Sequence, residues 1–135
     1  MNLNAALIRS TFGAAAENEP QLVRNFYQLL FTRYPQVKPM FSRNAPDKQA
    51  QMLQEALVTV VDHLDDATWL ADTLRAMGRK HLDYGVEPHM YDWVGECLLA
   101  ALADAAGEAW NDDAAAAWTE AYQALAGLML NGAQE

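Results

Sequence analysis

The feature that most constrains the fold is a helical spacing of apolar residues along nearly the whole chain. Apolar side chains recur every three or four positions, alanine is abundant between them, and alternating strand patterns are absent. Proline and glycine interrupt this pattern at intervals, where a helix must end or begin. The sequence therefore predicts an all-α protein.

The interruptions predict six helices and one short helical turn. We expect the first helix from Leu3 to Ala16 and the second from Pro20 to Tyr34, with the helical turn running from Pro35 to Phe41. A third helix is expected after Asp47, which is its predicted cap. Two more are expected between Asp66 and Tyr84 and between Pro88 and Gly107. The last helix begins at the capping group Asn111-Asp112-Asp113.

Apolar stripes predict which face of each later helix points inward. The helix after Asp47 carries the stripe Met52, Leu53, Ala56, Leu57, Val60, Val61 and Leu64. Gln49 lies one turn upstream on that stripe. The last helix turns Trp118, Ala121, Tyr122, Leu125 and Met129 inward. An amide on an apolar stripe needs a polar partner when the protein folds.

Composition limits the classes of function. The length of 135 residues predicts a single domain, residues 1–135. A net charge of −9 disfavours nucleic acid and anionic membranes as partners, and no apolar run reaches the roughly 18 residues of a spanning helix. The single cysteine, Cys97, can form no internal disulfide, and the first residues lack an export signal. We therefore expect a cytoplasmic protein without stable membrane insertion.

Three histidines are candidates for a metal ligand. His81 shares an inward helical face with Leu74 and Met77, so it is either a ligand or a hydrogen-bonded residue near a helix C-terminus. His63 stands beside Asp65 and Asp66 and is expected to be a solvated, acid-paired imidazole. His89 follows Pro88 in a first helical turn and is expected to be exposed.

The rest of the sequence restricts the kind of metal. It contains no HExxH motif, no cysteine pair and no carboxylate cluster spaced for a di-iron bundle. A lone imidazole cannot hold a bare ion. It can hold an iron whose other four ligands come with the cofactor, and that cofactor is haem.

Several segments together resemble bacterial single-domain globins and the haem domain of flavohaemoglobins. They are FYQLLFTRYP around Tyr27, PQVKPM before Phe41, Gln49 followed four residues later by Leu53, GRKH ending at His81, and YDWVGECLL beginning at Tyr91. The resemblance covers essentially the whole chain. It implies the globin fold, a three-over-three helical sandwich around one haem b (iron protoporphyrin IX).

The resemblance also implies roles for individual residues. His81 matches the proximal histidine bound to the iron, and Phe41 matches the phenylalanine stacked on the porphyrin. Tyr27 and Gln49 match the distal pair that hydrogen-bonds the gas ligand. Leu53 matches the apolar residue above that ligand.

On the proximal side the match is incomplete. Tyr91 matches a tyrosine that acts with a glutamate of the last helix on the proximal histidine, and Val94 on the same helix is a further expected haem contact. The glutamate position falls on Ala133, and the nearest acid is Glu135, which puts a peroxidase-like proximal site in doubt. Lys80 matches a basic position that meets a haem propionate, although a solvated lysine is an equal alternative.

Two functions from different classes follow from the resemblance. One is a haem protein that reversibly binds O₂, and also NO and CO. The other is a nitric oxide dioxygenase that needs an external flavin reductase, because the chain carries no reductase domain. A haem-free interaction domain is a weaker third reading, against which the histidine and the distal pair argue. We expect a monomer or a weak homodimer.

Overall fold

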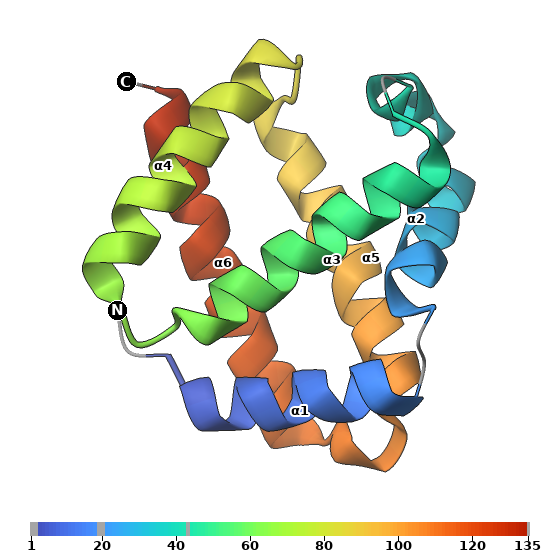
Figure 1. The fold of residues 1–135 in the computed structure, drawn as a ribbon, viewed down its shortest axis with the longest axis vertical. Coiled ribbons are helices and arrows are strands. Elements are labelled where there is room, and N and C mark those ends of the chain that lie inside the picture. Colours follow the sequence, from blue (N-terminus) through green and yellow to red (C-terminus); the bar gives the residue numbers. More distant parts are fainter. Residues whose placement is uncertain (1–2, 19–20, 43, 135) are drawn as a thin grey trace.

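The computed structural model describes residues 3–18, 21–42 and 44–134, and every regular element in these ranges is helical (Figure 1). The all-α prediction is therefore confirmed. In chain order the elements are α1 (Ala5–Asn18), α2 (Leu22–Arg33), the 3₁₀ helix η1 (Pro35–Phe41), α3 (Pro46–Asp62), α4 (Ala67–Asp83), α5 (Pro88–Ala106), the 3₁₀ helix η2 (Gly107–Ala109) and α6 (Asp112–Ala133).

Side-chain caps define two of the helix starts. The Asp66 carboxylate accepts from the Trp69 backbone N–H at 3.0 Å and begins α4. The Asn111 side chain accepts from the Ala114 N–H at 2.8 Å and begins α6, as the sequence predicts.

The predicted starts of α2 and α3 are not confirmed by the structure. The prediction that Asp47 caps α3 is wrong, because Pro46 already occupies the first helical position after Ala45. Asp47 lies in the first turn instead, and its carboxylate pairs with Arg24 at 2.8 Å. The expected start of the second helix at Pro20 lies outside the described residues.

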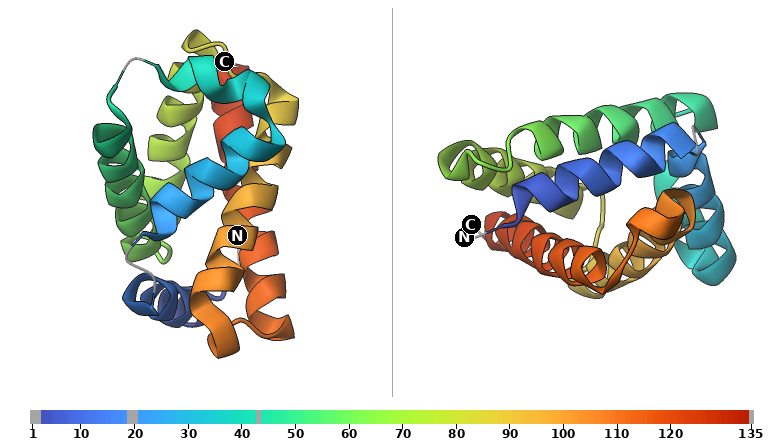
Figure 2. Two further views of the ribbon diagram at one scale, coloured as in Figure 1. Left: turned by 90° about the vertical axis from the view of Figure 1, so that its right-hand side faces the viewer. Right: turned by 90° about the horizontal axis from the view of Figure 1, so that it is seen from below.

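Helix α3 lies across one side of the molecule, opposite α5 and α6. In Figure 1, α3 crosses the molecule diagonally in front of α5 and α6, and Figure 2 shows it on the opposite side of the molecule from these two helices. It packs against α1 and α2, whereas α4 packs along α6. The helix that carries Gln49 and the helix that carries His81 thus have different main partners.

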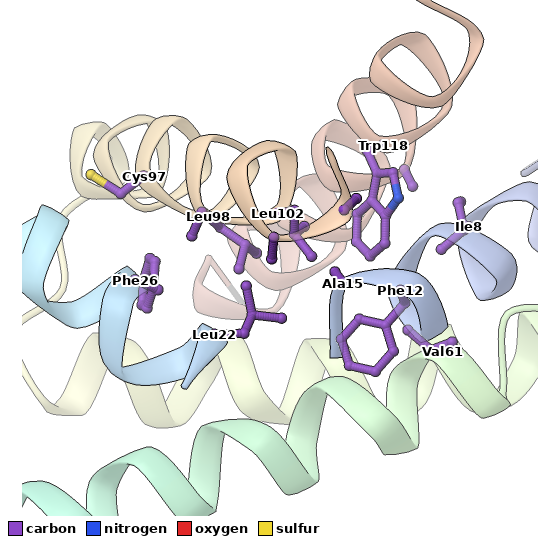
Figure 3. Packing of buried hydrophobic residues seen from close by; sticks show 14 of the residues in the cluster. Ile8, Phe12, Ala15, Leu22, Phe26, Val61, Cys97, Leu98, Leu102 and Trp118 are labelled. Carbon is purple, nitrogen blue, oxygen red and sulfur yellow. The ribbon is translucent and has the colours of Figure 1, made fainter. Parts of the chain in front are cut away.

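The main hydrophobic cluster lies where α1, α2, α5 and α6 meet the C-terminal half of α3 (Figure 3). Its most fully buried large side chains include Ile8, Leu30 and Leu102, and Cys97 is also fully buried, as expected for a small core residue. Leu70 and Leu74 of α4 are buried as well, but they are not part of this cluster.

Glycines allow α4 to approach α6 backbone to backbone. A Cβ atom on Gly78 of α4 would overlap the backbone of Met129, and one on Gly132 of α6 would overlap the backbone of Arg75. Both glycines are buried. This close packing fixes the position of α4, which carries His81 one turn after Gly78.

The inward stripe of α3 is only partly as predicted. Val61 and Leu64 are buried, and Leu53 and Leu57 are partly buried against the main cluster. Met52 is 48% exposed, so its assignment to the inward face is wrong. Its position lies at the edge of that face, because a step of 100° per residue separates it from Leu53.

None of the described helices is long and apolar enough to span a bilayer.

Candidate functional site

Tyr27 and Gln49, far apart in sequence, meet in the folded chain. The Gln49 side-chain nitrogen Nε2 of α3 donates a hydrogen bond to the Tyr27 hydroxyl of α2 at 3.1 Å. Burial raises the pKa of the Tyr27 phenol, and the hydrogen bond from Gln49 lowers it in part. Tyr27 therefore keeps its proton at neutral pH, and this proton is not used in the bond with Gln49.

Aromatic rings hold Tyr27 in place. Phe41, at the end of η1, meets it edge to face with ring centroids 5.4 Å apart, and Phe31 stacks on it at 5.7 Å. Phe31 and Phe41 are themselves 5.5 Å apart. The structure thus brings together three of the residues singled out from the sequence, namely Tyr27, Phe41 and Gln49.

His81 lies near the end of α4 with one ring nitrogen engaged. Its Nδ1 is 2.7 Å from the Met77 carbonyl oxygen one turn earlier, and the imidazole is half-buried. A carbonyl can only accept, so Nδ1 carries the proton and Nε2 presents a lone pair. This is the tautomer that a neutral histidine needs in order to bind a metal through Nε2.

His63 makes the same kind of backbone contact as His81 but has a different ring neighbour, and His89 is exposed. His63 does not pair with its acidic neighbours as expected, because its Nδ1 bonds the Thr59 carbonyl at 2.7 Å and its ring stacks on Trp69 at 3.9 Å. His89 is exposed, as predicted, and lies 3.3 Å from the Glu87 carboxylate.

The remaining candidates differ in how deeply they are buried. Leu53 and Val94 are partly buried against the main cluster, whereas Lys80 is exposed. Tyr91 is only 9% exposed, and burial raises the pKa of its phenol. Ala133 is half-buried, and Glu135 lies outside the described residues.

Two neighbours of the candidate residues were not found from the sequence. The Tyr122 hydroxyl of α6 donates to the Tyr91 backbone carbonyl at 2.6 Å, which ties α6 to the start of α5. The side-chain nitrogen of Asn44 lies 3.4 Å from the Gln49 side-chain oxygen. The inward face of α6 predicts the burial of Tyr122 but not its partner, and no periodicity marks a loop residue such as Asn44.

The donor set fits haem better than a bare metal ion. No three histidine, cysteine or acidic side chains within residues 3–18, 21–42 and 44–134 gather into a metal-binding group. His81 instead offers a single imidazole nitrogen, which suffices for an iron held by a porphyrin.

Comparison with known proteins identifies the family. The family model described as Globin matches residues 24–129, which include every candidate residue named above except Ala133 and Glu135. The chain belongs to the globin family. The globin resembles the flavohaemoprotein of Bordetella pertussis, with 31% identity over 127 residues that make up 93% of this chain and 32% of that protein. The globin thus spans about a third of the length of the curated relatives it matches.

Solved structures agree with this assignment. An engineered carbene transferase from Rhodothermus marinus, described as a candidate nitric oxide dioxygenase, has 28% identity and a TM-score of 0.84, covering 98% of this globin and 94% of that chain. A Pseudomonas aeruginosa protein described as structurally highly homologous to human haemoglobin gives the same TM-score at 18% identity, covering 95% and 96% of the two chains. The expected globin fold and the resemblance to flavohaemoprotein haem domains are confirmed.

Proposed function

We propose that this globin holds haem b through His81 and reversibly binds O₂, with NO and CO as further ligands, beside Tyr27 and Gln49. The observation that carries the proposal is the hydrogen bond from Gln49 to Tyr27, 3.1 Å long and next to Phe41. It places a phenol proton that needs an acceptor in a partly buried setting. A gas ligand with partial negative charge is such an acceptor.

Each proximal residue has a defined part in this proposal. Bound haem supplies an iron atom at which a diatomic gas can bind. His81 would hold that iron through the lone pair of Nε2, while the Met77 carbonyl accepts from Nδ1–H and orients the ring. Lys80 is exposed and can pair with a haem propionate.

The distal residues act on the gas ligand. Tyr27 accepts from Gln49 and so keeps its own O–H for the ligand. Leu53 lies one turn after Gln49 and supplies an apolar side chain that excludes water. Phe41 and Val94 are the expected apolar contacts of the porphyrin, together with Tyr91.

A second candidate function is nitric oxide dioxygenation. It is favoured by the likeness to the Rhodothermus marinus protein, which matches this globin over almost its whole length. In that reaction NO and O₂ combine to nitrate, and one electron from a flavin reductase is needed for each further turnover. The alanine at position 133 leaves Tyr91 without the glutamate partner that the resemblance suggests, which favours gas binding over strong proximal activation.

Absorption spectroscopy of the haem-reconstituted protein tests the proposal. We expect one haem per chain, a ferrous form that binds O₂ and CO, and release of O₂ when the gas is removed. A protein that binds no haem would contradict it. Steady NO consumption with an NADH-dependent flavin reductase would select the dioxygenase, whereas a single turnover without renewal would select the reversible binder.

A further inference from the structure

Asn44 connects the distal pair to the loop between η1 and α3. Its side-chain nitrogen Nδ2 lies 3.4 Å from the Gln49 oxygen Oε1 and 3.8 Å from the Met52 sulfur. A carbonyl oxygen and a thioether sulfur are both acceptors. Both contacts therefore require the NH₂ end of the Asn44 amide at this position. The contact also gives a role to Met52, which is 48% exposed on α3.

The Asn44 amide selects one of two orientations for Gln49. A glutamine side chain has an oxygen that accepts and a nitrogen that donates, and the two ends have nearly the same shape. Because Asn44 donates to Oε1, the Nε2 end of Gln49 is turned toward Tyr27. The contacts thus form an ordered series in which Asn44 donates to Gln49 and Gln49 donates to Tyr27.

This order determines what Tyr27 can do. A phenol has one proton, which it can donate only once. With Nε2 facing it, Tyr27 acts as acceptor toward Gln49, and its proton is available for another partner. With the amide reversed, Oε1 would take that proton, and Tyr27 would have none for a ligand.

We propose that Asn44 is a positioning residue that fixes the Gln49 amide so that Tyr27, and not Gln49, is the main hydrogen-bond donor to the gas ligand. The role of the ligand rests on the proposed function. The orientation of the amide does not, because the contacts exist in the protein chain alone. The two parts can therefore be tested separately.

The variant Asn44→Asp tests the orientation with almost no change in shape. An ionised aspartate only accepts hydrogen bonds, so it attracts Nε2 of Gln49 and turns Oε1 toward Tyr27. Ser42→Ala is the loop control, since the Ser42 hydroxyl donates to the Pro39 carbonyl at 2.8 Å and not to Gln49. Asn44→Asp in a Tyr27→Phe background separates the effect of orientation from that of the added charge.

In the haem-free protein, NMR reads the orientation directly. We expect a nuclear Overhauser effect between the Gln49 side-chain NH₂ protons and the Tyr27 ring protons, retained in Ser42→Ala and lost in Asn44→Asp. An unchanged effect in Asn44→Asp would overturn the proposed role of Asn44, whether or not the protein binds haem.

In the haem-loaded protein, ligand kinetics and vibrational spectra read the consequence. We expect Asn44→Asp to raise the O₂ dissociation rate about fivefold to tenfold, because the hydrogen bond from Tyr27 to the ligand is lost. The C–O stretching frequency of the CO complex should rise for the same reason. The same substitution in Tyr27→Phe should change both values little. Equal changes in the two backgrounds would show an effect of charge alone and overturn the inference. Failure of the unsubstituted protein to bind haem or O₂ would instead contradict the proposed function.

Discussion

The Nδ1 atom of His81 lies 2.7 Å from the carbonyl oxygen of Met77, one helical turn earlier in α4. The bond fixes the tautomer of the imidazole and leaves Nε2 as the atom that can bind iron. Because α4 packs closely on α6 through Gly78, the position of this nitrogen is set by the packing of two helices.

The substitution His81→Ala is expected to abolish stable haem binding. The iron would lose its protein ligand, and the remaining contacts with the porphyrin are mainly apolar. The measurement is the Soret absorbance per chain after reconstitution and gel filtration. His63→Ala and His89→Ala are matched controls and should retain it, because these imidazoles contact Trp69 and Glu87 instead. Full haem retention in His81→Ala would exclude His81 as the ligand.

Loss of either distal donor is expected to speed the release of O₂. Tyr27→Phe removes the phenol proton, and Gln49→Leu removes the amide that orients it. A hydrogen bond to a partly charged ligand in a buried site contributes about 1 to 3 kcal/mol, which corresponds to roughly 5-fold to 150-fold in rate. Stopped-flow displacement of O₂ by CO measures the effect. Unchanged rates in both variants would show that Tyr27 does not donate a hydrogen bond to the ligand.

Much of the helical framework could be predicted from the sequence, because local signals define it. Proline at the start of η1 and α5, the Asn111 cap and the terminal Gly107 act within one turn of the chain. The prediction of a cap at Asp47 is wrong because Pro46, one residue earlier, already supplies a favourable start for the helix.

The contacts within the candidate site could not be predicted from local patterns, because they join segments that are far apart in the sequence. The family resemblance pointed to Tyr27 and Gln49, and their hydrogen bond depends on how α2 and α3 pack. The partner of His63 could not be inferred either, since stacking on Trp69 competes with the adjacent carboxylates. Asn44 gave no signal, because loop side chains follow no repeat.

The packing of α4 on α6 predicts a strong effect of Gly78→Ala. The new methyl group would overlap the Met129 backbone, which cannot move as a flexible side chain could. We expect a loss of about 1 to 3 kcal/mol in the free energy of unfolding, as for an overpacked core, together with weaker haem binding as His81 moves.

Gly127→Ala is the matched control for this substitution. It lies inside α6, and a Cβ there would meet nothing within 4 Å, so it should gain about 0.5 to 1 kcal/mol from helix propensity. Urea unfolding followed by circular dichroism measures both variants. Equal stability of the two would show that α4 and α6 are not in close contact.

The contact of Glu96 with Arg33 and Tyr34 predicts a pH-dependent contribution to stability. Its carboxylate accepts from Arg33 and from the Tyr34 hydroxyl, each at 2.9 Å, and these two bonds lower the pKa of Glu96 below its ordinary value of 4.5. The folded state therefore favours the ionised form. The resulting stabilisation is fully present above pH 4.5 and is lost as the pH falls through the lowered pKa.

Glu96→Gln should therefore lower the urea midpoint at pH 7 by a small amount, and this difference should shrink as the pH falls below 4.5 toward pH 3. The effect is expected to be small because the pair is exposed to solvent and screened by salt. Glu55→Gln is a suitable control, since Glu55 is also exposed and its carboxylate accepts from Gln51 of its own helix at 3.2 Å. A midpoint difference for Glu96→Gln that stays the same from pH 7 to pH 3 would contradict a charge-dependent link, because a packing defect alone would persist after the carboxylate is protonated.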